Sequence, residues 1–300
     1  TLFELAHQGW TSYQKLRDEI TVSDDILKQY SFVANNPWQL AAKFKKVFSH
    51  DFAGPVVLVS GNKHYSWQKG ISLLGLGEES MWNVELDHNG KLSLEDLDDK
   101  IKQAQELQRP ILMLVTIAGT TELGEIDPID KVNKLLQTYK TKHNLDIWHH
   151  VDAAYGGFYT SMLGSKDKEK HLNRESIAAL KSIRDADSIT VDPHKLGYTP
   201  YACGSFLVKD RMNNQVSSFA APYISKSPVK NGWSSTLEGS RSACGIAATW
   251  LTSQAIGFGP QGLGSVLSKG LKACDKLQDL LSELEDCHYV DVCDTNVLCF

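Results

Sequence analysis

The stretch Ser188-Ile-Thr-Val-Asp-Pro-His-Lys195 joins a short apolar run to a polar turn that ends in a lysine. A run such as 188–191 is typical of a buried strand, and the proline soon after it marks the end of that strand. Taken alone, a lysine in such a turn is most often an exposed side chain. Its significance therefore depends on the rest of the chain.

Similar runs recur along the sequence, and segments with helical periodicity separate them. Strands are predicted at 55–60, 82–86, 111–117, 147–151, 188–191 and 205–208. Helices are predicted at 66–74, after a cap at Ser93, from Pro128, and within 239–286 with a break at 257–260. This alternation predicts an α/β fold with a mostly parallel sheet and helices on both faces. Ligands of such sheets bind at the carboxyl ends of the strands.

Polar clusters follow four of the predicted strands. They are Asn62-Lys-His-Tyr-Ser66, Ala118-Gly-Thr-Thr121, His150-Val-Asp-Ala-Ala-Tyr-Gly-Gly157 and Asp192-Pro-His-Lys195. One polar strand end means little, because loops are commonly polar. Four strand ends can converge on one pocket, and that pattern favours a functional site.

The residue types in these clusters suit a pyridine cofactor. A lysine such as Lys195 forms an imine from its neutral amine in a partly desolvated site. A carboxylate, for which Asp152 is the candidate, keeps the ring nitrogen protonated so that the ring can accept electrons. Candidates for the remaining contacts are His64 for stacking on the ring, Ala154 for the space under it, and His194, Thr120 and Thr121 for polar substituents.

Each candidate also has a structural interpretation. Lys195 could be an ordinary turn lysine, and Asp152 could be a helix cap. His64 could be a surface or core histidine, and Tyr201 and Tyr223 could simply pack. The joint occurrence of the motifs, in order and at strand ends, favours the functional interpretation.

Together these motifs resemble the group II pyridoxal-phosphate-dependent decarboxylases, which include aromatic amino-acid, tyrosine, histidine and glutamate decarboxylases. The resemblance runs from about Val56 to Phe300 and includes Gly124-Glu-Ile-Asp-Pro128. Lys195-Leu-Gly-Tyr-Thr-Pro-Tyr201 and Thr236-Leu-Glu-Gly-Ser-Arg241 look most like bacterial tyrosine decarboxylases. The resemblance implies the aspartate-aminotransferase type of fold (fold type I of the pyridoxal-phosphate-dependent transferases), with a central seven-stranded sheet.

The resemblance also implies residue roles. Lys195 would hold pyridoxal 5'-phosphate as a Schiff base, and Asp152 would pair with the pyridine nitrogen. His64 and Ala154 would lie on opposite faces of the ring. The remaining implied contacts are His194 with the phosphate, Thr120 or Thr121 and Asp192 beside the cofactor, Tyr201 on the substrate side, and Tyr223 as the acid that protonates the carbanion. Asp192 stands where some family members have asparagine.

Two family features bear on domain organisation. The Gly-Gly-Thr phosphate loop is absent, and residues 1–10 resemble the helix that follows that loop. Residues 288–300 look like the first strands of a further unit. We therefore expect 1–286 to be the cofactor-binding domain without its N-terminal part, and 287–300 to begin a truncated C-terminal domain of a longer chain.

Composition narrows the function classes further. The net charge of −5 gives no support for binding nucleic acid or an acidic membrane surface. No apolar run approaches the roughly 18 residues that span a bilayer. The six cysteines lack a CxxC pair, so we expect reduced thiols of a cytoplasmic protein and no metal site. The resemblance implies a homodimer.

The expected activity is α-decarboxylation of an L-amino acid to the amine and carbon dioxide, and the expected substrate is a tyrosine-like aromatic amino acid. Two alternatives stay open. One is a carbon–carbon lyase similar to sphingosine-phosphate lyase, whose lysine motif has a comparable Gly-Tyr-x-Pro tail. The other is a non-catalytic binding protein with the same fold.

Overall fold

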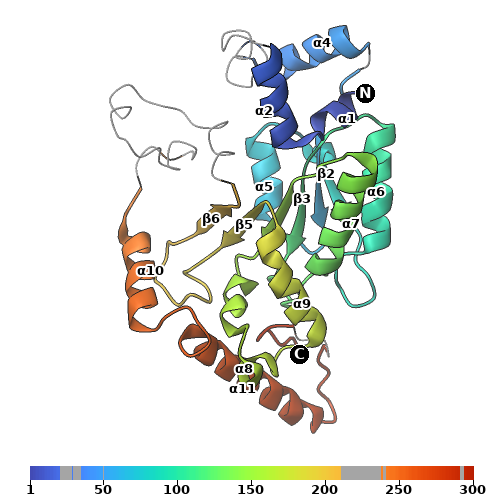
Figure 1. Cartoon of the computed structure of the whole chain (residues 1–300). Helices are drawn as coiled ribbons and strands as arrows, with labels where there is room; N and C mark the ends of the chain where they lie inside the picture. The colour runs from blue at the N-terminus through green and yellow to red at the C-terminus, as the bar shows by residue number, and fades with distance from the viewer. Residues whose placement is uncertain (21–28, 30–34, 50, 211–237, 239–240, 291–293) are drawn as a thin grey trace. The chain divides into compact units, whose positions relative to one another are not determined.

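The computed structural model describes residues 1–20, 29, 35–49, 51–210, 238, 241–290 and 294–300 (Figure 1). The chain divides into two compact units. The first comprises residues 1–116 and 131–149, and the second comprises residues 117–130 and 150–300. Within the described ranges, we find no helix with the length and apolar character needed to span a membrane.

A mostly parallel sheet contains all the strands of the described part. These are β1 (Val56–Ser60), β2 (Met81–Val84), β3 (Ile111–Ile117), β4 (His149–Asp152), β5 (Ser188–Val191) and β6 (Ser205–Val208), in the order β2-β1-β3-β4-β5-β6. β1 pairs in parallel with β2 and β3, β4 pairs in parallel with β5, and β6 is antiparallel to β5. The α/β prediction is confirmed, with six strands in the described residues where the resemblance implied seven.

The first unit has two apolar clusters, and both include buried residues of β1. Its helices are α1 (Leu2–Ala6), α2 (Gly9–Ile20), α4 (Pro37–Phe48), α5 (Ser66–Leu73), the short η1 (Glu78–Ser80), α6 (Leu94–Glu106) and most of α7 (Ile129–His143). The hydroxyl of Ser93 accepts the Asp96 amide, which confirms the predicted cap of α6. The stripe Leu97, Ile101 and Ala104 then buries one face of that helix.

The second unit has its own core, which includes Val151, Tyr159 and Leu267. Its helices are η2 (Gly156–Met162), α8 (Lys166–Glu169), α9 (Arg174–Ser182), η3 (Ile183–Asp185), α10 (Cys244–Ala255) and α11 (Leu263–Ser282). The predicted break between the last two helices is confirmed. Gly264 lets α11 approach η2 closely, because a Cβ at that position would lie 2.5 Å from the Ser161 carbonyl oxygen.

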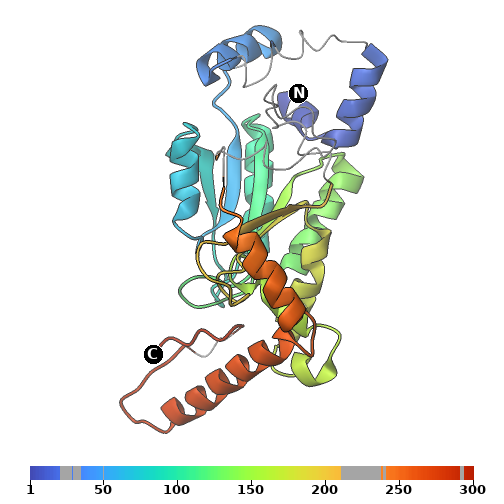
Figure 2. The ribbon, with the colours of Figure 1, turned by 90° about the vertical axis from the view of Figure 1, so that its left-hand side faces the viewer.

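The C-terminal stretch differs from its prediction. The described residues of 288–300 contain no strand, and the chain turns back after α11 (Figure 2). Asp294 is buried there, and its Oδ2 accepts the Ile126 amide at 2.8 Å. Polar side chains of this stretch thus bind neighbouring turns, where the prediction expected strands. The domain boundary at 286/287 stays a prediction.

Candidate functional site

The lysine turn after β5 is held by its own main chain. The Lys195 amide donates to the Asp192 carbonyl at 2.9 Å, and the Thr199 amide donates to the Pro193 carbonyl at 3.0 Å. Gly197 is required inside this turn, because a Cβ there would lie 2.6 Å from the Pro193 oxygen. The sequence therefore fixes the main chain of Lys195 locally.

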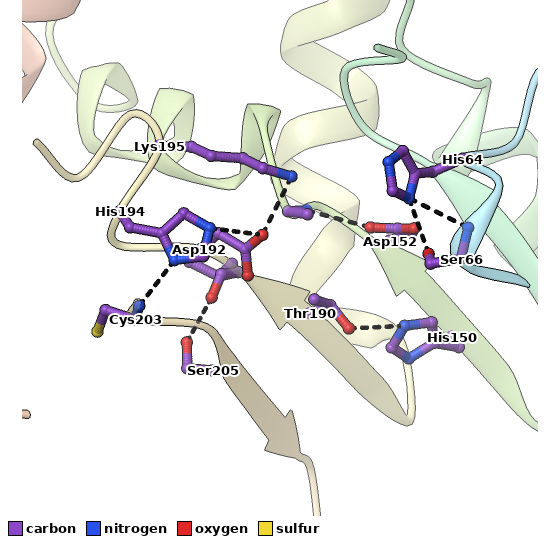
Figure 3. A network of polar contacts seen from close by, with 12 residues as sticks. His64, Ser66, His150, Asp152, Thr190, Asp192, His194, Lys195, Cys203 and Ser205 are labelled. Atoms are coloured by element: carbon purple, nitrogen blue, oxygen red, sulfur yellow. Dashed lines mark hydrogen bonds and ion pairs between the residues drawn. The ribbon is translucent and has the colours of Figure 1, made fainter. Parts of the chain in front are cut away.

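Asp192 brings two other side chains of this turn together (Figure 3). Its Oδ2 lies 3.0 Å from Nζ of Lys195 and 3.5 Å from Nε2 of His194. The Asp192 side chain is 14% exposed and that of Lys195 is 32% exposed. The lysine amine is therefore accessible to a ligand, while its carboxylate partner is largely shielded from water.

His194 has a defined orientation and tautomer. Its Nδ1 accepts the Cys203 amide at 2.8 Å, and its own amide donates to the Cys203 carbonyl at 3.2 Å. In the neutral ring the hydrogen must then reside on Nε2, the nitrogen that faces Asp192. Tyr201 stacks on the imidazole with ring centroids 4.1 Å apart, and its side chain is exposed.

Asp152 is the last residue of β4 and is half-buried. Its Oδ1 accepts the Ala154 amide at 3.3 Å, so the carboxylate does support the following turn, as in a helix cap. The Ala154 carbonyl in turn accepts the Asp192 amide at 3.2 Å. This hydrogen bond connects the turn after Asp152 to the lysine turn, within the second unit.

The turn after β3 separates the two threonine candidates. Thr120 is buried, its hydroxyl donates to the carboxylate of Glu125, and the same oxygen accepts the Glu125 amide at 3.1 Å. Thr121 is exposed. The Thr120 hydroxyl therefore shapes the turn, and Thr121 is the better placed of the two for contact with a ligand.

The other two candidates do not belong to the described part of the second unit. His64 follows β1 in the first unit, where its Nδ1 accepts the Ser66 amide at 3.3 Å and lies 2.8 Å from the Ser66 hydroxyl. Tyr223 lies outside the described residues. The second unit thus brings together Asp152, Ala154, Asp192, His194, Lys195 and Tyr201.

Sequence reasoning gave no role to His150, two residues before Asp152 and on the same face of β4. Its Nδ1 lies 2.8 Å from the Ser188 hydroxyl and its Nε2 lies 3.1 Å from the Thr190 hydroxyl, which places all three side chains in a row across β4 and β5. Burial lowers the pKa of His150 to about 4. Thr190 is also the register partner of Asp152. The sequence did contain a signal for this residue, because His150 and Asp152 are two positions apart in a strand and therefore share one face.

The residues of the second unit fit pyridoxal phosphate. An accessible lysine amine suits the aldehyde, and an imidazole Nε2–H suits an anionic oxygen. A half-buried carboxylate at a strand end suits a protonated ring nitrogen, and a small alanine leaves room for a flat ring. The aldehyde, the phosphate and the ring nitrogen of the cofactor thus each have a chemical counterpart among these side chains.

Comparison with known proteins gives consistent matches. The family described as "Pyridoxal-dependent decarboxylase conserved domain" matches residues 33–300. The L-tyrosine decarboxylase of Enterococcus faecium is 30% identical over 250 residues, covering 76% of this chain and 41% of that protein. The L-2,4-diaminobutyrate decarboxylase of Acinetobacter baumannii is 26% identical over 265 residues, covering 87% of this chain and 48% of that protein.

A solved structure agrees with these sequence matches. The crystal structure of mouse CSAD has a TM-score of 0.66 and 25% identity, and the match covers 80% of this chain and 47% of that one. The chain therefore spans less than half the length of each of these three proteins.

Proposed function

Because this chain belongs to the pyridoxal-dependent decarboxylase family, we propose that it carries the cofactor lysine of an enzyme that removes the α-carboxylate of an L-amino acid. Pyridoxal phosphate is the cofactor of the family, and its members are carboxy-lyases. One observation carries the proposal for this chain: Asp192 joins Lys195 to His194, next to the strand end that bears Asp152.

Bound pyridoxal phosphate supplies an electron-accepting ring that stabilises the carbanion left when carbon dioxide departs. In our proposal, Nζ of Lys195 anchors the cofactor carbonyl. The Asp152 carboxylate would hold a proton on the ring nitrogen, and the His194 ring would contact the phosphate. Ala154 leaves space for the ring, and the exposed Thr121 hydroxyl borders it.

Further roles rest on sequence motifs. His64 is proposed to stack on the ring, and Tyr223 is proposed to protonate the α carbon through its phenol. Tyr201 is proposed to contact the substrate, because its exposed ring already stacks on His194. We also propose a homodimeric state and a cytoplasmic location, which likewise rest on the sequence.

The proposed substrate is a tyrosine-like aromatic amino acid. Relatives named L-tyrosine decarboxylase from two Enterococcus species, at 30% and 31% identity, support this choice. Other relatives are named for diaminobutyrate, at 26% identity, and for aspartate, at 35% identity over a shorter stretch of 199 residues. A panel of tyrosine, dopa, tryptophan, glutamate and histidine, with detection of released carbon dioxide, tests the substrate class directly.

The decisive experiment compares Lys195→Ala with Lys209→Ala. Lys209 is an exposed lysine of the same unit whose Nζ donates to the Asp185 carbonyl. Borohydride reduction followed by peptide mapping should locate the cofactor on Lys195. We expect Lys195→Ala to lose the cofactor absorbance band and all carbon dioxide release, and Lys209→Ala to keep both. Full activity of Lys195→Ala would overturn the proposal.

The same assay separates the alternatives. Cleavage of phosphorylated amino alcohols without carbon dioxide release would indicate a carbon–carbon lyase. Cofactor binding without turnover of either substrate class would indicate a binding protein.

A further inference from the structure

Asn296, near the C-terminal end of the chain, binds two tyrosines that follow β4. Its side-chain Oδ1 accepts hydrogen bonds from the Tyr155 hydroxyl at 2.8 Å and the Tyr159 hydroxyl at 2.5 Å. Its main-chain amide donates to the Tyr159 hydroxyl oxygen at 3.0 Å. Burial raises the pKa of both phenols, so both remain donors at neutral pH. One amide oxygen therefore anchors two side chains that are far from it in sequence.

Tyr155 lies where the turns after β3 and β4 meet. A Cβ at Gly119 would lie 3.1 Å from Cδ1 of Tyr155 and 2.9 Å from the Gly156 nitrogen. The Gly156 amide donates to the Ala118 carbonyl at 2.8 Å, and a Cβ at Gly156 would lie 2.4 Å from that same oxygen. The two turns are thus in direct contact, and the Tyr155 ring lies against this contact.

Neighbours of Asn296 support the turn after β3 from another direction. Asp294 accepts the Ile126 amide, and the Cys299 thiol donates to the Glu122 carbonyl at 3.0 Å. Thr295 fills the space beside Gly124, whose φ of +75° and close contact with the threonine hydroxyl both require glycine. The stretch 294–299 therefore contacts both turns that carry cofactor candidates.

We propose that Asn296 is a positioning residue of the cofactor site. Through Tyr155, it holds the turn that follows Asp152 against the turn that carries Thr121. The proposal rests on the function proposed above and extends it to the C-terminal stretch. Loss of Asn296 therefore loosens the turns after β3 and β4. The lysine turn keeps its own main-chain hydrogen bonds and is affected only through the Asp192 amide, which donates to the Ala154 carbonyl.

The test uses Asn296→Ala, Tyr155→Phe and the double variant in the full chain. Hydrogen exchange, measured without cofactor, reports the amides of Gly119, Thr120 and Gly156, which all donate to main-chain carbonyls in these turns. An absorbance titration gives the dissociation constant for pyridoxal phosphate. We expect faster exchange in both turns and about tenfold weaker binding, equivalent to about 1.4 kcal/mol. The double variant should be no worse than Asn296→Ala alone, because that variant already lacks the acceptor of the Tyr155 hydroxyl.

Tyr139→Phe is the matched control. It removes a phenol hydrogen bond of similar length, 2.6 Å to Asp98, in the first unit. We expect it to lower the thermal midpoint without faster exchange in either turn. Asn296→Ala could fail to fold. In that case Tyr155→Phe tests the hydrogen bond between the two residues, because it removes the hydroxyl and keeps the packed ring. Exchange at the wild-type rate in Tyr155→Phe would overturn the proposal. A wild-type chain that binds no cofactor would refute the proposed function, and the exchange data would still decide the role of Asn296.

Discussion

Nζ of Lys195 and Oδ2 of Asp192 lie 3.0 Å apart, and the same carboxylate oxygen also faces Nε2 of His194. Asp192 stays in place because its amide donates to the Ala154 carbonyl and because Gly204 leaves room beside its other oxygen. A Cβ at Gly204 would lie 3.0 Å from Oδ1 of Asp192. One carboxylate thus restricts the conformations of both an amine and an imidazole.

Asp192→Ala should therefore weaken binding of pyridoxal phosphate by about tenfold, because two side chains lose the contact that orders them. Asp192→Asn keeps an acceptor oxygen in the same place and should lose less. Absorbance titration and borohydride trapping on Lys195 measure the effect. Equal affinity of the alanine variant and the wild type would show that the contact has no role in binding.

Asp152 should matter more for turnover than for folding. Asp152→Ala and Asp152→Asn are expected to lower turnover by at least about a hundredfold, the usual effect of removing a group that controls a proton at a reacting centre. The asparagine variant can still accept the Ala154 amide and should keep its yield and thermal midpoint. Comparable losses of turnover and yield in both variants would identify Asp152 as structural.

His150 predicts a pH dependence of stability. Burial lowers the pKa of His150 from about 6.5, the value expected in the unfolded chain, to about 4 in the folded protein. The unfolded chain therefore binds the proton more readily. Stability should therefore fall as the pH decreases from about 6.5 to about 4, by an amount on the order of 3 kcal/mol for this group. His150→Gln cannot take up that proton. Urea unfolding across this range should show a shallower pH slope for the variant, and identical slopes would refute the assignment.

Gly156→Ala should destabilise the second unit. The new Cβ would lie 2.4 Å from the Ala118 carbonyl oxygen, a main-chain atom that cannot move aside easily. Overpacking of this kind costs about 1–3 kcal/mol. The control is Gly70→Ala in α5, where no atom lies within 4 Å of the new Cβ. That change should stabilise the chain by about 0.5–1 kcal/mol, because alanine favours helix. Urea denaturation of both variants tests the contrast.

The sequence was sufficient to place the strands because each is a short apolar run between turn residues. Each of the six strands predicted between residues 55 and 208 overlaps an observed one, and the ends differ by at most two residues. The polar turns after β4 and β5 were found for a related reason, since a parallel sheet gathers ligand-binding residues at strand ends. The interpretation of Lys195 depended on this shared position, because its local sequence resembles an ordinary turn.

Contacts between residues far apart in the chain could not be predicted in this way. Asn296 and Tyr155 are separated by 141 positions, and a single asparagine leaves no periodic signal. The stretch 288–300 was predicted to form the first strands of a further unit. That prediction is wrong for the described part, where Asp294 and Asn296 instead bind partners in the turns.

The paired hydrogen bonds between His194 and Cys203 have a consequence for the loop that follows His194. They close residues 195–202 into a loop whose two ends are fixed to each other. Replacement of the exposed Tyr201 within this loop should therefore leave the main chain of Lys195 in place.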